Sequence, residues 1–348
     1  MLGMNNAEQR SSSTSRSERY LVTGGAGFIG SHLVEDLLAR GAHVTVIDDL
    51  STGRIENIAH LLDRPDFRFI QESIRNEVVM DRLASESDIL VHLAAAVGVR
   101  LIVEQPVHTI ETNVMGTEAV LKAARRYRVK VLLASTSEVY GKGNSVPFSE
   151  EDDVVLGPTT RSRWSYAATK MVDEFLGLAY EVESKLPVVI FRLFNTVGPR
   201  QVGQYGMVIP RFVGQALRGE PLTVYADGRM TRCFMHVKDA VQGILSLADC
   251  PEAVGQVFNI GTTEEVSILN LARMVLSILD GSPEPVPAND PRIRFVPYEQ
   301  AYKKGFEDMS RRVPDTSKIQ ALTMWQPQLG LEMILKDIIK DARDRMTN

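Results

Sequence analysis

A tyrosine and a lysine four residues apart, Tyr166 and Lys170, are the pair in this sequence best suited to acid–base chemistry. On a helix this spacing places both side chains on one face. A phenol has a reference pKa of about 10 and is a poor base at neutral pH, but a nearby ammonium group stabilises the phenolate. The pair therefore predicts a tyrosine base whose pKa is lowered by the lysine. The same spacing also occurs by chance on ordinary helices, so other residues must support the prediction.

A second polar cluster, Ser135, Thr136, Ser137 and Glu138, ends an apolar run suited to a buried strand. Side chains at the carboxyl end of a parallel strand face the crevice where ligands bind in α/β proteins. Serine and threonine could instead form a turn or a helix cap, but neither of these needs the glutamate. We therefore predict that Thr136, Ser137 and Glu138 lie in the catalytic site.

A glycine-rich segment, residues 23–30, follows the first strand-like run and precedes a helical pattern. Glycines at 25, 27 and 30 allow a tight turn, close approach to a pyrophosphate, and packing of helix on strand. Alone this pattern is weak, because a glycine-rich turn need not bind anything. Asp48 strengthens it, since it lies eighteen residues after Gly30 at the end of the second strand pattern. A carboxylate there accepts the ribose hydroxyls of NAD and repels the 2′-phosphate of NADP, although a solvated turn aspartate is the alternative.

The elements that must position these residues follow an alternating pattern. Apolar runs suited to buried strands are separated by stretches with apolar residues at three- and four-residue spacing, which is typical of crossover helices. We therefore predict an α/β fold: a Rossmann-type doubly wound parallel sheet with a smaller, interleaved α+β substrate lobe. The expected strands are residues 20–23, 43–47, 89–93, 131–135 and 188–191, and the expected helices are 31–40, 117–127 and 167–180.

The pattern becomes irregular after about Gly198. We expect residues 20–197, with later returning segments, to form the NAD-binding domain and residues 198–348 to form mainly the substrate-binding lobe. Short strands are expected there at 222–225 and 257–260, helices at 268–279 and 331–345, and a proline-rich loop at 282–291.

The composition excludes several other classes of protein. Apolar residues make up 44% of the 348 residues and charged residues 24%, which is ordinary for a globular protein. No apolar run reaches the roughly 18 residues that a membrane span needs, and a net charge of −5 argues against a nucleic-acid surface. Two cysteines are too few for a disulfide framework, so we expect a cytoplasmic protein. We expect no metal site, and a flexible tail over residues 1–19.

Taken together and in this order, five segments resemble the extended short-chain dehydrogenases that modify nucleotide sugars: the phosphate turn, residues 92–95, 113–117 and 135–141, and the Tyr-x-x-x-Lys pair. The resemblance covers about residues 20–345. It implies that NAD takes a hydride from sugar C4 to give a 4-ketone. It also implies that Tyr166 is the base on the 4-hydroxyl, that Lys170 binds the nicotinamide ribose, and that Thr136 bonds the 4-oxygen.

The same resemblance implies a larger set of contacts. Asn195 matches a position that contacts the sugar nucleotide, and Arg232 an arginine near the nucleotide or the catalytic centre. Arg200 and Arg211 could instead be solvated surface residues. The implied substrate residues are Arg163, Asn195, Arg200, Arg211 and Arg232. The implied cofactor residues are Gly24, Gly27, Phe28, Ile29, Gly30, Asp48, Leu93, Ala94, Ala95, Asn113, Ser135, Tyr166 and Lys170.

Family members pair through the helices that follow the Asn113 and Tyr166 segments, which implies a homodimer. Val172, Phe175 and Leu176 could supply the apolar surface of its interface, or they could simply pack on the sheet.

Four functions remain open at this stage. A 4-epimerase needs no acidic residue at position 138, whereas a 4,6-dehydratase uses a glutamate at C5 and a uronate decarboxylase uses glutamate and arginine around the carboxylate. Residues 157–166 and 305–315 resemble segments of UDP-glucuronate decarboxylases, although residues 95–99 depart from the proline-rich loop of the UDP-xylose synthases. We therefore rank UDP-glucuronate decarboxylase first, a nucleotide-sugar 4-epimerase such as one for UDP-glucose or UDP-glucuronate second, and 4,6-dehydratase third. A non-catalytic NAD-sensing regulatory protein is last, because such proteins typically lose the tyrosine or the lysine.

Overall fold

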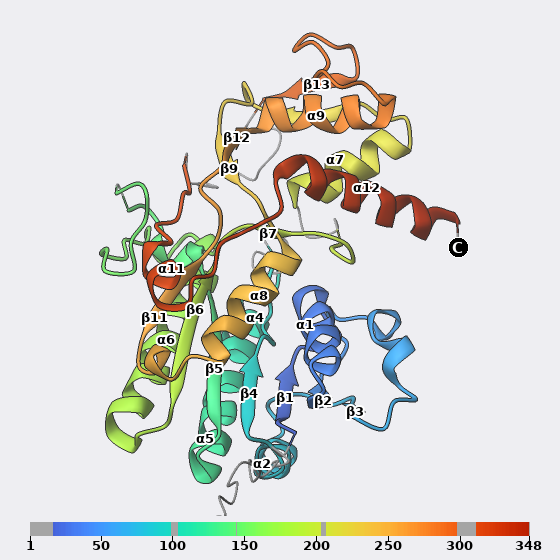
Figure 1. Cartoon of the computed structure of the whole chain (residues 1–348). Coiled ribbons are helices and arrows are strands. Elements are labelled where there is room, and N and C mark those ends of the chain that lie inside the picture. Colours follow the sequence, from blue (N-terminus) through green and yellow to red (C-terminus); the bar gives the residue numbers. More distant parts are fainter. Residues whose placement is uncertain (1–16, 99–103, 144, 203–206, 298–310, 348) are drawn as a thin grey trace, which may run out of the picture.

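A seven-stranded parallel sheet forms the centre of the larger part of the molecule (Figure 1). The computed structural model describes residues 17–98, 104–143, 145–202, 207–297 and 311–347. The strand order is β11-β6-β5-β4-β1-β2-β3, which confirms the predicted doubly wound α/β fold. The strands are β1 (Arg19–Thr23), β2 (His43–Ile47), β3 (Phe67–Ile70), β4 (Ile89–His92), β5 (Lys130–Thr136), β6 (Val188–Leu193) and β11 (Val257–Ile260).

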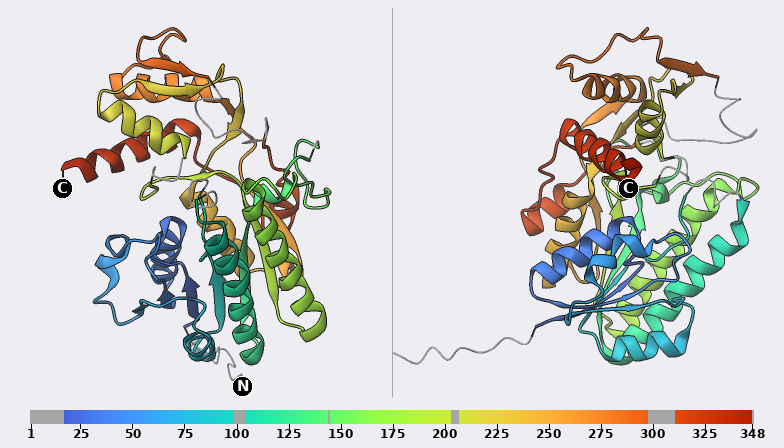
Figure 2. Two further views of the ribbon diagram at one scale, coloured as in Figure 1. Left: turned by 180° about the vertical axis from the view of Figure 1, so that it is seen from behind. Right: turned by 90° about the vertical axis from the view of Figure 1, so that its right-hand side faces the viewer.

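Helices cover both faces of this sheet, as the nearly continuous burial of its central strands requires. Figure 2 shows the two helical layers on either side of the sheet. The first layer contains α1 (Phe28–Ala39), α8 (Val237–Ala248) and α11 (Ser317–Thr323). The second contains α2 (Glu77–Ser85), α5 (Gly116–Tyr127) and α6 (Arg163–Ser184).

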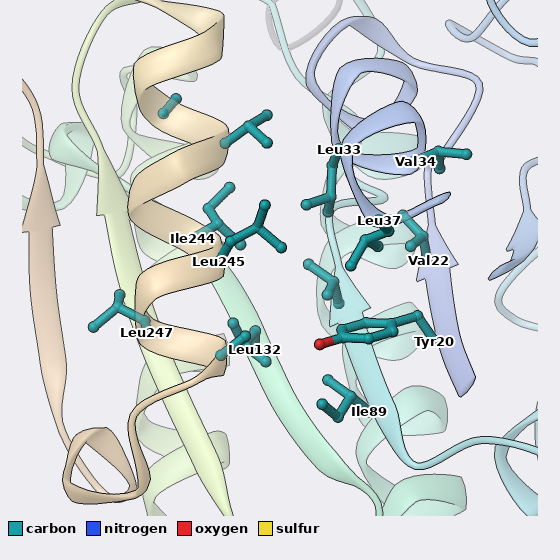
Figure 3. Close-up of a cluster of buried hydrophobic side chains, with 14 of the residues drawn as sticks. Tyr20, Val22, Leu33, Val34, Leu37, Ile89, Leu132, Ile244, Leu245 and Leu247 are labelled. Carbon is teal, nitrogen blue, oxygen red and sulfur yellow. The ribbon is translucent and has the colours of Figure 1, made fainter. Parts of the chain in front are cut away.

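The largest hydrophobic core lies between the first layer and the sheet (Figure 3). Leu33 and Leu37 of α1 and Leu245 of α8 pack with Val22 of β1 and Leu132 of β5, and all five are at most 1% exposed. Burial of apolar surface stabilises by about 25 cal/mol per Å². This packing fixes α1 against β1 and therefore fixes the turn that joins them.

The chain changes direction across the sheet at β1. It runs outward from β1 through β2 to β3, and then returns to place β4 on the other side of β1. Such a switch point leaves a crevice at the carboxyl ends of the strands, where ligands bind in α/β proteins. The glycine-rich turn and Asp48 follow strands that end at this edge, and the 135–138 cluster spans the last two residues of β5 and the turn after it.

A smaller lobe lies over that edge of the sheet and has its own hydrophobic core (Figure 1). Most of this core comes from three helices and a two-stranded parallel sheet. The helices are α7 (Val208–Leu217), α9 (Ile268–Asp280) and α12 (Leu331–Thr347), and the strands are β8 (Leu222–Tyr225) and β13 (Ile293–Val296).

Shorter elements connect the lobe to the sheet or shape the crevice. The paired short strands are β7 (Thr196–Val197) with β10 (Met235–His236), and β9 (Thr231–Cys233) with β12 (Glu265–Ser267). The short helices are η1 (Ile55–Asn57), η2 (Ala59–Leu61), α4 (Pro106–Ile110), η3 (Glu111–Met115), η4 (Ser137–Tyr140) and η6 (Pro251–Ala253).

The structure differs from the predicted elements in several places. The run 257–260, expected in the small lobe, is strand β11 and pairs with β6 at the edge of the central sheet. The sequence analysis also omitted β3, α2, α7 and α8. The predicted loop 282–291 contains no helix or strand. Part of the predicted tail, residues 1–16, and residues 305–310 of the carboxyl-terminal motif lie outside the described residues.

In the described part of the chain, the helices are all too short or too polar to cross a bilayer.

Candidate active site

A cavity of about 660 Å³ lies between the carboxyl edge of the sheet and the small lobe. Gly27 and Asp48 line one end of it, Glu138 and Tyr166 line the middle, and Arg211 lines the lobe side. With the exception of Asn113, the sequence-predicted site residues all line this cavity. One continuous space therefore has room for an extended cofactor and a substrate side by side.

The glycine-rich turn brings the start of α1 close to the end of β1. Gly24 has a φ of +72°, and a Cβ atom there would lie 2.8 Å from the backbone nitrogen of Ala94. A Cβ atom at Gly30 would lie 2.2 Å from the carbonyl oxygen of Gly24, so only glycine fits. α1 begins after Gly27 with no side-chain cap and no acidic residue in its first turn. Its amino-terminal N–H groups therefore suit a pyrophosphate, and the turn fits a dinucleotide.

Asp48 lies immediately after β2 and is buried. Its carboxylate accepts hydrogen bonds from the backbone nitrogens of Ala26, at 3.0 Å, and Leu50, at 2.9 Å. Burial raises the pKa of Asp48, and these two donors oppose the rise. The carboxylate is thus held in a fixed position beside the glycine-rich turn, where it fits the ribose of a cofactor and disfavours a second phosphate.

Tyr166 and Lys170 lie on one face of α6, but their electrostatics differ from the prediction. Burial raises the pKa of Tyr166, the negative charge of Glu138 raises it further, and a hydrogen bond with Thr136 lowers it in part. Lys170 is buried, and its ammonium pairs with Asp173 at 2.8 Å. The pKa of Tyr166 is thus raised, by burial and by Glu138, where the spacing of the tyrosine and lysine predicted that it would be lowered.

Glu138 lies between two arginines from different parts of the chain. Its carboxylate pairs with Arg163 of α6 at 3.2 Å and with Arg312 at 2.7 Å. Burial alone would raise the pKa of Glu138, but Arg312 and Arg163, with a smaller contribution from Arg232, hold it below its usual value. Glu138 is therefore ionised at neutral pH, and both arginine side chains are less than 10% exposed.

Arg312 is a site residue that the sequence analysis did not select. It belongs to a segment, residues 311–316, that we call the C-terminal strap, and it lines the cavity. The strap pairs with Phe148 through a short parallel bridge. The sequence contains a weak signal, since residues 305–315 resemble a decarboxylase motif. Its local spacing does not show which of its two arginines, Arg311 or Arg312, enters the site.

Asn113 has a different position from the one predicted. Its side chain is 1% exposed, accepts from the backbone nitrogen of Ala96 at 2.8 Å, and donates to the hydroxyl of Thr169 at 3.1 Å. It therefore joins the 94–98 wall of the cavity to α6 from behind, instead of reaching the cavity itself.

The remaining polar residues on the lobe side are already engaged. Arg200 pairs with Glu35 of α1 at 2.6 Å. Arg211 lies over the ring of Tyr225, with 4.1 Å from its guanidinium carbon to the ring centroid. The amide of Asn195 donates to the carbonyl of Cys233 at 3.0 Å. Arg232 donates to the carbonyl of Thr231 at 2.8 Å. Arg232 is the member of this group that also contributes to the charge around Glu138.

Across the described residues, histidine, cysteine, aspartate and glutamate nowhere form a group of three or more suited to a metal ion.

Comparison with known proteins agrees with this geometry. The family model for GDP-mannose 4,6 dehydratase matches residues 21–338. The chain is 41% identical to the UDP-N-acetyl-alpha-D-glucosaminuronate decarboxylase of Bacillus cytotoxicus over 94% of this chain and 98% of that protein. It is 40% identical to UDP-glucuronic acid decarboxylase 4 of Arabidopsis thaliana over 94% of this chain and 69% of that protein.

Solved structures show the same similarity. The dTDP-glucose 4,6-dehydratase of Streptomyces venezuelae, with NAD and TYD bound, has a TM-score of 0.82 and 30% identity, covering 94% of this chain and 98% of that one. The UDP-glucuronic acid 4-epimerase of Bacillus cereus, in complex with UDP-glucuronic acid and NAD, has a TM-score of 0.81 and 30% identity, covering 94% and 99%.

Proposed function

Within the GDP-mannose 4,6 dehydratase family, to which the chain belongs, we propose that it is an NAD-dependent decarboxylase of a UDP-linked uronic acid, with UDP-glucuronate as the first candidate. The observation that carries this proposal is the pair of buried arginines around Glu138. The relatives at about 40% identity named above, both decarboxylases of UDP-linked uronates, support it.

The charge of this cluster suits an anionic substituent on the sugar. Arg312, Arg163 and Arg232 all place positive charge around the Glu138 carboxylate. Guanidinium groups bind carboxylates through charge-assisted hydrogen bonds. A carboxylate at sugar C6 would be attracted to these arginines, whereas the uncharged hydroxymethyl group of a dehydratase substrate would not.

The site also has groups for each bond change. Tyr166, once ionised, takes the proton of the sugar 4-hydroxyl, and Thr136 holds the same oxygen. The glycine-rich turn would hold the pyrophosphate of NAD and Asp48 a ribose, and the bound cofactor would accept the hydride from C4. The resulting 4-keto-uronate is a β-keto acid. Its C5–C6 bond breaks with release of CO2, the electron pair moves to the C4 oxygen, which Tyr166 and Thr136 stabilise, and C5 then takes a proton from water. Return of the hydride to C4 and of the Tyr166 proton to the C4 oxygen would complete the reaction, so that the product is lighter by CO2 alone and the cofactor is again oxidised.

Glu138 separates this function from the runner-up. A UDP-glucuronate 4-epimerase also binds a uronate, so the positive cluster alone does not exclude it. Epimerisation needs two hydride transfers at C4 and no acid–base group beside C5 or C6. The ionised carboxylate of Glu138, held between two arginines, therefore favours the decarboxylase over the epimerase, because only decarboxylation removes the charge at C6.

Mass spectrometry of the products tests the proposal. The protein is incubated with NAD and, separately, with UDP-glucuronate, UDP-N-acetylglucosaminuronate, UDP-glucose and dTDP-glucose. We expect loss of the mass of CO2 from a uronate and no change in the uncharged sugars. Loss of water from dTDP-glucose would replace the proposal with a dehydratase, and a C4 epimer of unchanged mass would replace it with an epimerase.

We also propose a homodimer, on the evidence of an apolar surface over η3 and α6. Val172, Phe175 and Val182 of α6 and Met115 of η3 are all exposed, and Phe175 is 68% exposed. Leu176, by contrast, packs against the sheet core and is not part of this surface. Exposed apolar side chains gathered on one face indicate an interface. Sedimentation should give a dimer for the wild type and a monomer for Phe175→Glu, and a monomeric wild type at micromolar concentration would contradict the proposal.

A further inference from the structure

Tyr140 lies two residues after Glu138 and is fully buried, although its hydroxyl is polar. That hydroxyl accepts a hydrogen bond from Nη1 of Arg192 at 2.9 Å and donates one to Oδ1 of Asn259 at 2.7 Å. The function proposed above gives no role to this tyrosine. A phenylalanine would fill the same space, so the hydroxyl must be explained by what it bonds.

Asn259 belongs to β11 and links this strand to the C-terminal strap by hydrogen bonds. Its Nδ2 donates to the carbonyl of Phe148 at 2.9 Å and to the carbonyl of Asp315 at 3.1 Å. Both amide hydrogens are therefore used, and Oδ1 is left to accept from Tyr140. The tyrosine hydroxyl thus sets which way the amide faces.

Phe148 holds the strap on both sides of Pro314. Its backbone nitrogen donates to the carbonyl of Val313, and its carbonyl accepts from the nitrogen of Asp315, each at 2.8 Å. The ring of Phe148 stacks on Tyr140 with 4.7 Å between centroids. Gly261 leaves the space that Pro314 occupies, since a Cβ atom there would lie 2.9 Å from the proline ring.

The other end of this network reaches the wall of the cavity. Arg192 forms two hydrogen bonds with Glu174 of α6, at 2.9 and 2.7 Å. Glu174 in turn accepts a hydrogen bond from Ser135, which lines the cavity beside Thr136. A continuous path of buried polar groups therefore runs from the catalytic segment to the strap.

We propose that Tyr140 is a positioning residue, whose hydroxyl fixes the C-terminal strap so that Arg312 reaches Glu138. Arg312 immediately precedes Val313, the first strap residue held by Phe148, so a shift of this backbone moves its guanidinium. The inference rests on the proposed function only where it concerns catalysis, because there Arg312 is the group that meets the substrate carboxylate.

The variant Tyr140→Phe tests this with little change in shape, since the stack on Phe148 is kept. Amide hydrogen exchange should become faster at Asp315 and across the strap. CO2 release should fall about 10- to 100-fold, the size expected when a reacting group is misplaced, while NAD affinity stays constant. Tyr20→Phe is the matched control: this tyrosine is also buried, in the core under α1 and α8 (Figure 3), and its hydroxyl donates to Glu18.

Repeating the measurement in an Arg312→Lys variant distinguishes a positioning role of Tyr140 from a general loss of stability. If Tyr140 acts through Arg312, then Tyr140→Phe should have little further effect on CO2 release in an Arg312→Lys background. Equal fold losses in both backgrounds would overturn the proposal. Asn259→Ser, which leaves Tyr140 in place, should loosen the strap in the same way.

The exchange measurement needs no substrate, so it distinguishes two kinds of failure. If the wild type releases no CO2 from any uronate, the decarboxylase function fails, and strap exchange still decides the role of Tyr140. If strap exchange in Tyr140→Phe equals that of the wild type and of Tyr20→Phe, the positioning role is wrong whatever the reaction is.

Discussion

Replacing Glu138 with glutamine should slow catalysis and tighten substrate binding at the same time. The amide keeps the shape of the carboxylate but removes its charge, so Arg163 and Arg312 lose a negative partner while both stay buried. Breaking a buried ion pair by removing one partner costs about 3–5 kcal/mol. Because Glu138 is 20% exposed and a glutamine oxygen can still accept from one arginine, we take the lower end, about 3 kcal/mol, for the free enzyme.

A uronate brings back the missing negative charge. If about half of that cost is recovered on binding, UDP-glucuronate should bind the Glu138→Gln variant about 10-fold more tightly, which corresponds to about 1.4 kcal/mol. Loss of the carboxylate that holds Arg163 and Arg312 in place should lower CO2 release by about 10²-fold, the size expected when a reacting group is misplaced. Oxidation at C4 remains possible, so NADH and the 4-keto sugar should accumulate.

Calorimetry in the presence of NAD measures the first effect, and CO2 release with NADH absorbance measures the second. UDP-glucose is the matched control ligand, because without a carboxylate it should bind the wild type and the variant alike. Weaker binding of UDP-glucuronate by the variant would refute the electrostatic reasoning. Interconversion of C4 epimers at close to the wild-type rate, without CO2, would replace the decarboxylase with an epimerase.

Three further outcomes are expected. Tyr166→Phe should lower turnover by about 10² to 10⁴ and leave NAD binding unchanged, because only the basic hydroxyl is lost; near-normal turnover would show that another group is the base. Thr136→Val should move the rising limb of the rate–pH profile to higher pH, since Tyr166 acts when deprotonated and the Thr136 hydrogen bond lowers its pKa; an unmoved limb would count against this assignment. NAD should bind more tightly than NADP by calorimetry, and Asp48→Asn should narrow the difference, whereas equal binding by the wild type would contradict the role given to Asp48.

The elements that the sequence predicted share a simple physical origin. Strands such as β4 and β6 are buried on both faces, so nearly all of their residues are apolar and the runs stand out. β3 was missed because it lies at the sheet edge, where only Phe67 is buried and Arg68 interrupts the run. α8 was missed because Gly243 lies in its interior, where glycine is unfavourable for a helix. The structure shows why glycine is there: a Cβ atom at this position would crowd Ile260 and Trp325.

The candidate site shows a similar division. Residues that follow a strand or share one helix face, such as Glu138, Tyr166 and Lys170, could be placed from local spacing. Arg312 could not, because its place depends on contacts of the strap with Phe148 and Asn259, which are distant in the sequence. The pKa of Tyr166 is raised where a lower value was predicted for a related reason, since the local pattern does not show that the phenol is buried beside Glu138.

The position of β11 has a consequence for how the protein is made. β6 is synthesised before β11, so its outer edge stays open until the intervening part of the lobe and then β11 have been made. An unpaired strand as apolar as β6 is a site where nascent chains can pair wrongly with one another. The strap is made later still, so the arginine that completes the cluster around Glu138 arrives near the end of translation. A nascent chain can therefore acquire its cofactor turn well before it can acquire a complete site for the sugar.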